Sequence, residues 1–113
     1  STMDECINAS TLSLSPSNTL VNKFSVQQNY PNPFNPITKL KYFIPEDGNV
    51  EITIYDLNGK IVKSFRKGYM PAGSYSLSWN SLNNNDDIIP SGIYFCSITF
   101  NELSKTIKMA FLK

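Results

Sequence analysis

This 113-residue sequence contains no histidine. Its main candidates for acid–base catalysis, nucleophilic attack or metal binding are therefore nine carboxylates and two cysteines. The missing imidazole excludes most schemes in which histidine activates a serine or cysteine nucleophile. It also disfavours a zinc site, since only carboxylates and cysteines remain as charged ligands. A glycosidase would need two carboxylates facing each other across a cleft, whereas most of those present here fall in segments with turn composition. We therefore predict that the protein is not an enzyme and that it has no catalytic residue and no cofactor.

The best metal candidate is the oxygen-rich loop Asn83–Asp87. Calcium binds clustered oxygen ligands that loops supply. The loop lacks the Asp-x-Asp-x-Asp-Gly register and the distal glutamate of an EF-hand, and two adjacent aspartates in an extended stretch point apart. We favour a solvated loop and predict no metal site, with calcium binding kept as the alternative.

Positive charge gathers in two predicted strands, yet the total is balanced. Ten Lys and Arg against nine Asp and Glu give a net charge of +1, which does not fit a nucleic-acid-binding protein, whose affinity rests on clustered cations. The clustered cations belong either to charged edge strands that discourage pairing or to a weakly basic surface for an anionic partner. These residues are Lys60, Lys63, Arg66 and Lys67 in one segment, and Lys39 and Lys41 in another.

Short segments of alternating apolar and polar residues fill the chain from Phe24 onward, separated by turn residues. Asn58-Gly59 is the strongest hairpin signal among these turns, and strands at such regular spacing favour an antiparallel β-sandwich of about seven strands. We expect Trp79 to fill its core. The predicted strands are Thr38–Ile44, Val50–Tyr55, Lys60–Lys67, Ser74–Asn80, Gly92–Phe100 and Lys105–Leu112.

Two further segments flank this pattern. The proline-rich stretch Tyr30–Pro36 cannot be a helix, and we expect Tyr30 and Phe34 to pin it to the core. Residues 1–23 are rich in Ser, Asn and Thr and read as a flexible linker, with one short extended piece at Leu12–Leu14. This linker has neither the basic nor the apolar region of a signal peptide, and no apolar run is long enough for a membrane-spanning helix.

The two cysteines leave the redox compartment undecided. Cys96 lies in an alternating strand, where a free cysteine commonly packs as a small buried hydrophobe. Cys6 lies in the predicted linker, so a disulfide between the two is a weak expectation.

An ordered set of motifs connects the chain to a known family. It resembles the type A C-terminal sorting domain of cargo proteins of the bacterial type IX secretion system, and the related immunoglobulin-like domain of flagellar hook-capping proteins. The resemblance covers about residues 24–113. The motifs are Asn29–Thr38, Tyr55–Lys60, Ala72–Tyr75, Trp79, Ser91–Phe95 and Lys108–Lys113.

The resemblance implies an immunoglobulin-like sandwich over residues 24–113 that serves as an address for secretion. The expected partners are the translocon and sortase at the outer membrane, together with an upstream cargo domain. The cargo would pass through the periplasm and finish secreted or at the cell surface, with cleavage before Phe24. By position, the translocon would recognise an accessible final strand and its neighbour, and deleting Lys108–Lys113 would abolish export without unfolding the domain. The implied recognition residues are Gly92, Tyr94, Lys108, Met109, Ala110, Phe111, Leu112 and Lys113.

The sequence departs from the family pattern after the tryptophan. Ser81, Asn83 and Asp86 stand where the family usually has Gly, Asp and Gly, although Asn and Asp tolerate left-handed conformations. Tyr75 stands where the family often has histidine. Two alternatives stay open: a structural module like the hook-capping domain, and a carbohydrate-binding or adhesive module. The second would need a row of exposed aromatic side chains, for which the candidates are Phe43, Tyr55, Phe65 and Tyr69.

Overall fold

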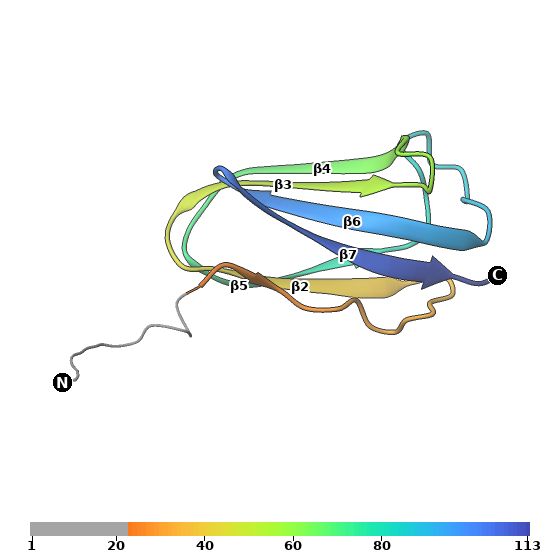
Figure 1. Cartoon of the computed structure of the whole chain (residues 1–113), viewed down its shortest axis with the longest axis horizontal. Helices are drawn as coiled ribbons and strands as arrows, with labels where there is room; N and C mark the ends of the chain where they lie inside the picture. Colours follow the sequence, from red (N-terminus) through yellow and green to blue (C-terminus); the bar gives the residue numbers. More distant parts are fainter. Residues whose placement is uncertain (1–22) are drawn as a thin grey trace.

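The computed structural model describes residues 23–113, which form two antiparallel sheets packed face to face (Figure 1). The smaller sheet has the order β1-β2-β5 and the larger one the order β4-β3-β6-β7. The prediction of an all-β sandwich of about seven strands is confirmed. The strands are β1 (Ser25–Val26), β2 (Thr38–Ile44), β3 (Gly48–Tyr55), β4 (Ile61–Met70), β5 (Gly73–Trp79), β6 (Gly92–Phe100) and β7 (Leu103–Phe111).

The core consists of the alternate residues that the period-two pattern placed inward. In β2, β3, β6 and the end of β7, every second side chain is buried. Removing each of these large apolar side chains from water contributes about 1.5–3 kcal/mol to folding. The predicted inward residues found buried are Leu40, Tyr42, Ile44, Val50, Ile52, Ile54, Tyr94, Cys96, Ile98, Phe100, Met109 and Phe111.

An aromatic cluster around Trp79 joins the two sheets. Trp79 is fully buried, as predicted, and its indole Nε1 donates a hydrogen bond to the Leu82 carbonyl at 2.9 Å. Its ring lies 5.6 Å from that of Phe34 and 6.4 Å from that of Tyr94, while the rings of Phe34 and Phe111 are 5.1 Å apart. Phe34 therefore pins the proline-rich segment to the core, as expected.

Tyr30 does not pin that segment, so this expectation was wrong. Its side chain is 80% exposed. The backbone of Tyr30 exchanges hydrogen bonds with Lys39, at 3.1 and 2.9 Å. Residues directly opposite each other in an antiparallel pair share a face, and the exposed side chain of Lys39 marks the outer one.

Four strands extend beyond their predicted bounds: β3 begins at Gly48 and β5 at Gly73, one or two residues early, and β4 and β7 extend further. β4 continues through the predicted loop to Met70, because Gly68, Tyr69 and Met70 pair with Val50, Asn49 and Gly48 of β3. β7 likewise starts at Leu103, opposite Phe100. In both cases a partner strand in register overrides a local turn composition. The Asn58-Gly59 turn forms as predicted, with Gly59 at φ 81°.

Cys96 is fully buried on β6, and burial raises the pKa of its thiol from 9.0 to about 12. Its proposed partner Cys6, the predicted linker and the extended piece at Leu12–Leu14 lie outside the described residues. Phe24, near the start of the described residues, is buried, and its ring centroid lies 5.6 Å from that of Phe100. Among the described residues, no helix is long and apolar enough to cross a membrane.

The Cys96 thiol makes stability depend on alkaline pH. Above about pH 9 the unfolded chain loses the thiol proton, whereas the folded chain keeps it until about pH 12. The free energy of unfolding should therefore fall over this window, with this thiol contributing up to about 1.4 kcal/mol per pH unit. Urea denaturation between pH 8 and pH 11 measures the slope. Cys96→Ala should flatten it, and equal slopes in the two proteins would contradict the assignment.

Candidate functional site

The final strand β7 forms one edge of the larger sheet, and a second segment covers the end of that edge. Gln28 donates from Nε2 to the Lys108 carbonyl at 2.7 Å, and Asn32 Oδ1 accepts from the Ala110 amide at 2.9 Å. Phe34 donates its amide to the Ala110 carbonyl at 3.0 Å and accepts from the Leu112 amide at 3.1 Å. The Lys108 carbonyl, both backbone groups of Ala110 and the Leu112 amide therefore have hydrogen-bond partners at the end of β7. The side chains of this end are the groups that remain for recognition by a partner.

The proposed recognition residues divide between the core and the surface. Tyr94, Met109 and Phe111 are buried at 4%, 0% and 1% exposure. This corrects the expectation of a uniformly accessible end, because side chains of a strand alternate between its two faces. The remaining members reach the surface, Ala110 only partly; they are Gly92, Lys108, Ala110, Leu112 and Lys113.

Tyr94 holds the strand beside β7 in place. Its hydroxyl donates to the Pro90 carbonyl at 2.6 Å, which confirms the expected backbone partner. Desolvation by burial, and to a lesser degree the nearby Asp56 carboxylate, raises the pKa of the Tyr94 phenol above its usual value. The phenol stays protonated and able to donate at neutral pH, so Tyr94 is a structural residue of the site.

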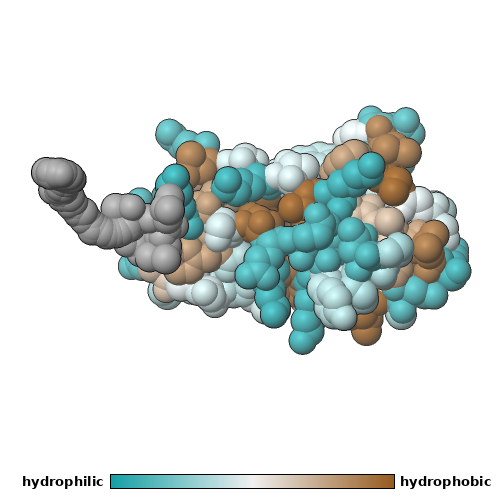
Figure 2. All heavy atoms as spheres, turned by 60° about the horizontal axis from the view of Figure 1, so that its bottom comes forward, coloured by the Kyte–Doolittle hydropathy of each residue, from teal (hydrophilic) through white to brown (hydrophobic). Residues whose placement is uncertain are grey.

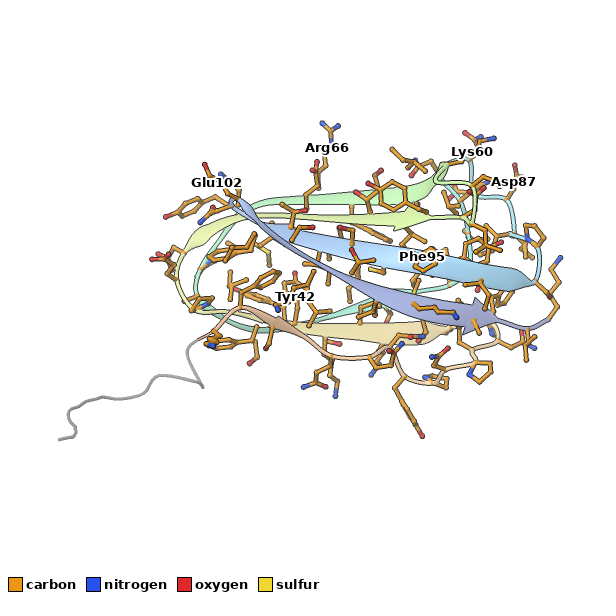
Figure 3. The ribbon with its side chains drawn as sticks, viewed as in Figure 1. Tyr42, Lys60, Arg66, Asp87, Phe95 and Glu102 are labelled. Carbon is orange, nitrogen blue, oxygen red and sulfur yellow. The ribbon has the colours of Figure 1, made fainter. Side chains whose placement is uncertain are left out.

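The exposed side chains of β7 continue into an apolar area on the outer face of the larger sheet. Lys108 lies opposite Phe95 of β6, which lies opposite Tyr55 of β3, and Ala110 lies opposite Ile93. Figure 3 shows Phe95 on β6, between its neighbours β3 and β7. We call these five residues the outer patch. The sequence analysis named Tyr55 only as a candidate for carbohydrate binding and did not single out Ile93 and Phe95, although alternation with the buried Ile54, Tyr94 and Cys96 marks all three as outward.

The Asn83–Asp87 loop uses its amide oxygens internally. Asn83 Oδ1 accepts from the amides of Asn85 and Asp87, at 2.8 and 2.9 Å, and Asn84 Oδ1 accepts from the Ser64 amide at 3.1 Å. Among residues 23–113, no group of three His, Cys, Asp or Glu could hold a metal ion. The loop thus closes the sandwich and caps the start of β4.

The departures from the family pattern keep its backbone geometry. Ser81 and Asp86 adopt φ values of 67° and 64°, in the left-handed region where the family usually has glycine. Ser81 is fully buried, and its Oγ donates to the Pro36 carbonyl. This side-chain bond offsets part of the cost of a left-handed serine.

The aromatic candidates for carbohydrate binding do not form a row. Phe43 lies on the outer side of β2 and Tyr55 on the outer side of β3, so they belong to opposite faces of the sandwich. Phe65 packs against the core beneath Lys63, whose Nζ is 5.6 Å from the ring centroid. Only Tyr69, at 70% exposure, is fully available.

Charged side chains surround the sandwich without converging. Lys60, Arg66, Asp87 and Glu102 project outward in Figure 3, while Tyr42 lies between the layers. Arg66 Nε lies 3.3 Å from Glu51 Oε2, and both side chains are exposed, so the pair contributes at most about 1 kcal/mol. Figure 2 shows hydrophilic side chains crossing the middle of the face that it presents, with hydrophobic groups toward its ends.

Comparison with known proteins decides what kind of domain this is. The family described as the secretion system C-terminal sorting domain matches residues 28–111. The chain belongs to this family. The sorting domain therefore has a role in type IX secretion, and membership implies interaction with the secretion machinery and a secreted or cell-surface protein. Sorting-signal domains of this kind are generally non-catalytic.

Solved structures share the fold of the sorting domain. Dimeric latent PorU from Porphyromonas gingivalis is 18% identical, with a TM-score of 0.61 over 89% of this chain and 10% of that one. PorZ, a type IX surface component of the same organism, is 18% identical with a TM-score of 0.51, over 82% of this chain and 12% of that one. The hook-capping protein FlgD from Xanthomonas campestris is 22% identical with a TM-score of 0.55, over 77% and 64%. A search of the curated proteins finds no match.

These neighbours show that the sorting domain shares its immunoglobulin-like sandwich fold with a domain of hook-capping proteins. The sorting domain spans less than two thirds of the FlgD chain and about a tenth of PorU and PorZ. The functions of those whole proteins are therefore not assigned to the sorting domain from the shared fold.

Proposed function

We propose that the sorting domain directs a larger cargo protein across the bacterial outer membrane through the type IX translocon. The observation that carries this proposal is the family match over residues 28–111, which includes all of β2–β7. The cargo precedes the sandwich, passes through the periplasm and is released or held at the cell surface. A sortase cleaves in the segment before Phe24, because its Ser-, Asn- and Thr-rich composition is that of a linker, and linkers can enter a protease cleft.

Recognition by the translocon uses the surface side chains of β7 and its neighbours. Lys108, Ala110 and Leu112 alternate with the buried Met109 and Phe111, which fix the strand against the core. Gly92 and Lys113 lie exposed at the same end. The apolar members of the outer patch supply area that becomes buried on binding, while Lys108 and Lys113 select an acidic partner surface.

Export of a reporter tests this proposal. The full chain is fused behind a periplasmic reporter in a type IX-competent host, and reporter outside the cell is measured. The double variant Lys108→Glu/Leu112→Asp should lower export about tenfold or more, which corresponds to about 1.4 kcal/mol of lost recognition. The matched control is Lys60→Glu/Leu57→Asp, which makes the same changes at exposed residues of the β3–β4 turn.

Each outcome of the export assay has a defined meaning. Retention of the unaltered fusion inside the cell would overturn the sorting function. Equal export of the two double variants would overturn recognition through β7 while leaving the sorting function in place. The mass of the exported reporter shows whether cleavage has occurred, since removal of the sandwich lowers the mass of the fusion by about that of residues 24–113.

A further inference from the structure

One sheet edge lacks the protection that the other three edges have. β1 is only two residues long, β7 contains Lys105 and Lys108 and is covered at its C-terminal end by the segment from Gln28 to Phe34, and β4 has register shifts, three cations and the Asn84 cap. β5 is seven residues long, pairs with β2 in unbroken register and contains no charge and no proline. Natural proteins usually shield an edge of this kind against added strands.

The free backbone groups of β5 belong to its serines. On β2, Lys39 and Lys41 direct their backbone groups toward Tyr30 and Gln27. Because backbone direction alternates along a strand, Leu40 and Tyr42 direct their backbone groups toward β5, where they pair with Leu77 and Tyr75. The N–H and C=O groups of Ser74, Ser76 and Ser78 therefore face away from β2. Within residues 23–113 no further hydrogen bond to these groups exists. Their short, exposed side chains leave room for a neighbouring strand.

An apolar seam runs along the inner side of this edge, between β5 and β4. Half-buried apolar side chains of these two strands form it, and they are five of the seven partly buried hydrophobics around the core. A hollow of about 340 Å³ opens at one end of the seam, where Phe65, Ser78 and Trp79 meet, and the charged side chains of Lys63 and Asp86 also line this hollow. A strand added to β5 would cover this seam with every second side chain. The seam residues are Val62, Phe65, Met70, Tyr75 and Leu77.

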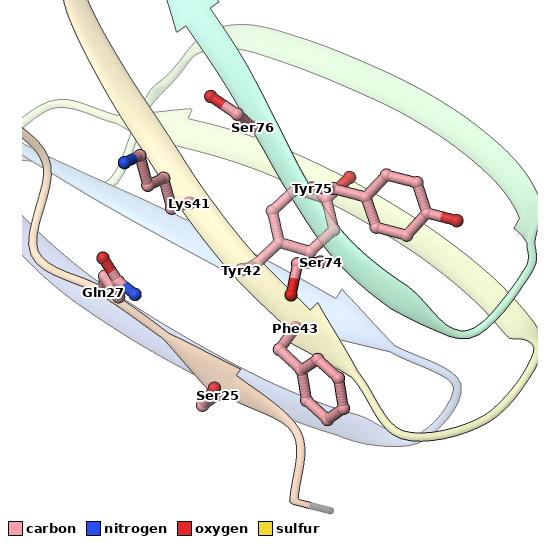
Figure 4. Close-up of a pocket in the computed structure, with 8 residues that line it drawn as sticks. All are labelled: Ser25, Gln27, Lys41, Tyr42, Phe43, Ser74, Tyr75 and Ser76. Carbon is pink, nitrogen blue, oxygen red and sulfur yellow. The ribbon is translucent and has the colours of Figure 1, made fainter. Parts of the chain in front are cut away.

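The outer side of the same edge is basic. Lys41 lies directly opposite Ser76, and Lys39 lies opposite Ser78. Figure 4 shows Lys41 near Ser76 on the outer face of the smaller sheet, and both residues line a hollow of about 290 Å³. A strand added next to β5 would lie about 10 Å from β2, which is within the combined reach of a lysine and a glutamate side chain.

We propose that β5 accepts an extended polypeptide strand in which apolar and acidic side chains alternate. The apolar side chains cover the seam, the acidic ones face Lys39 and Lys41, and the backbone bonds to Ser74, Ser76 and Ser78. This is strand addition at a sheet edge, where main-chain bonds provide affinity and alternate side chains provide specificity. β5 is an edge of the smaller sheet, whereas β7 is an edge of the larger one, so this surface does not depend on the proposed route of export.

Binding of defined peptides to the full chain tests the proposal. A labelled heptapeptide alternating Glu and Val, with both ends blocked, should bind at least about tenfold more tightly than one alternating Lys and Val. Lys39→Glu/Lys41→Glu should reverse this preference. Ser76→Pro should abolish binding, because it removes an outward N–H without breaking a bond to β2, whereas Ser76→Thr should retain it. Thermal denaturation of each variant reports its folding.

Modified peptides keep the test decisive even if Ser76→Pro does not fold. N-methylation at only the Val or only the Glu positions removes one row of N–H groups, so only one of the two peptides should lose binding. Equal binding of the Glu and Lys peptides, indifference to both methylations, or self-association through β5 without peptide binding would each overturn the proposal. The Lys108→Glu/Leu112→Asp variant should bind the Glu peptide normally, which separates this surface from the export surface.

Discussion

Replacing Phe34 with alanine is expected to lower the free energy of unfolding by about 3–5 kcal/mol, as for other large aromatic core residues. The side chain is 1% exposed and contacts the rings of both Trp79 and Phe111. Its loss would also loosen the two backbone hydrogen bonds that Phe34 makes to Ala110 and Leu112. Urea denaturation of the full chain, followed by tryptophan fluorescence, measures the change.

Tyr30→Ala is the matched control for this prediction. Tyr30 lies in the same proline-rich segment, but its side chain is 80% exposed, so the change should stay within about 0.5 kcal/mol. A cost below about 1 kcal/mol for Phe34→Ala would contradict the role of Phe34 in the core, since alanine would leave a large cavity there.

Deletion of Lys108–Lys113 is expected to unfold the domain. The deleted residues include Met109 and Phe111, buried at 0% and 1% exposure, and the pairing of β7 with the start of β6. Loss of two such side chains costs about 5–10 kcal/mol, which is comparable to the whole stability of a small domain, about 5–15 kcal/mol. Near-ultraviolet circular dichroism and thermal denaturation of the shortened chain should show no cooperative transition.

This prediction corrects the expectation that the shortened domain still folds. Loss of export after truncation would not distinguish recognition from folding, whereas Lys108→Glu/Leu112→Asp alters surface groups and should melt within a few degrees of the unaltered chain. A shortened chain that unfolds cooperatively near the temperature of the full chain would contradict the core placement of β7.

Period-two alternation was sufficient to predict six of the seven strands, all but the two-residue β1, and most of the side chains that face the core. Residues such as Ile52, Tyr94 and Trp79 are buried as predicted, because burying one face of a sheet fixes which alternate side chains point inward. The Asn58-Gly59 turn could also be predicted from the sequence, since its conformation depends on a local glycine, which adopts a φ of 81°. The ordered motifs also pointed to the family that the match over residues 28–111 shows.

Alternation assigns a residue to a face, but it does not say which strand lies beside it. The row from Tyr55 through Phe95 to Lys108 exists only because β3, β6 and β7 are neighbours in one sheet. The cover of β7 by Phe34 joins residues far apart in the chain, as does the contrast between protected β7 and open β5. Such non-local pairings decide which of the predicted surface residues act together, whereas local sequence decides only that they reach the surface.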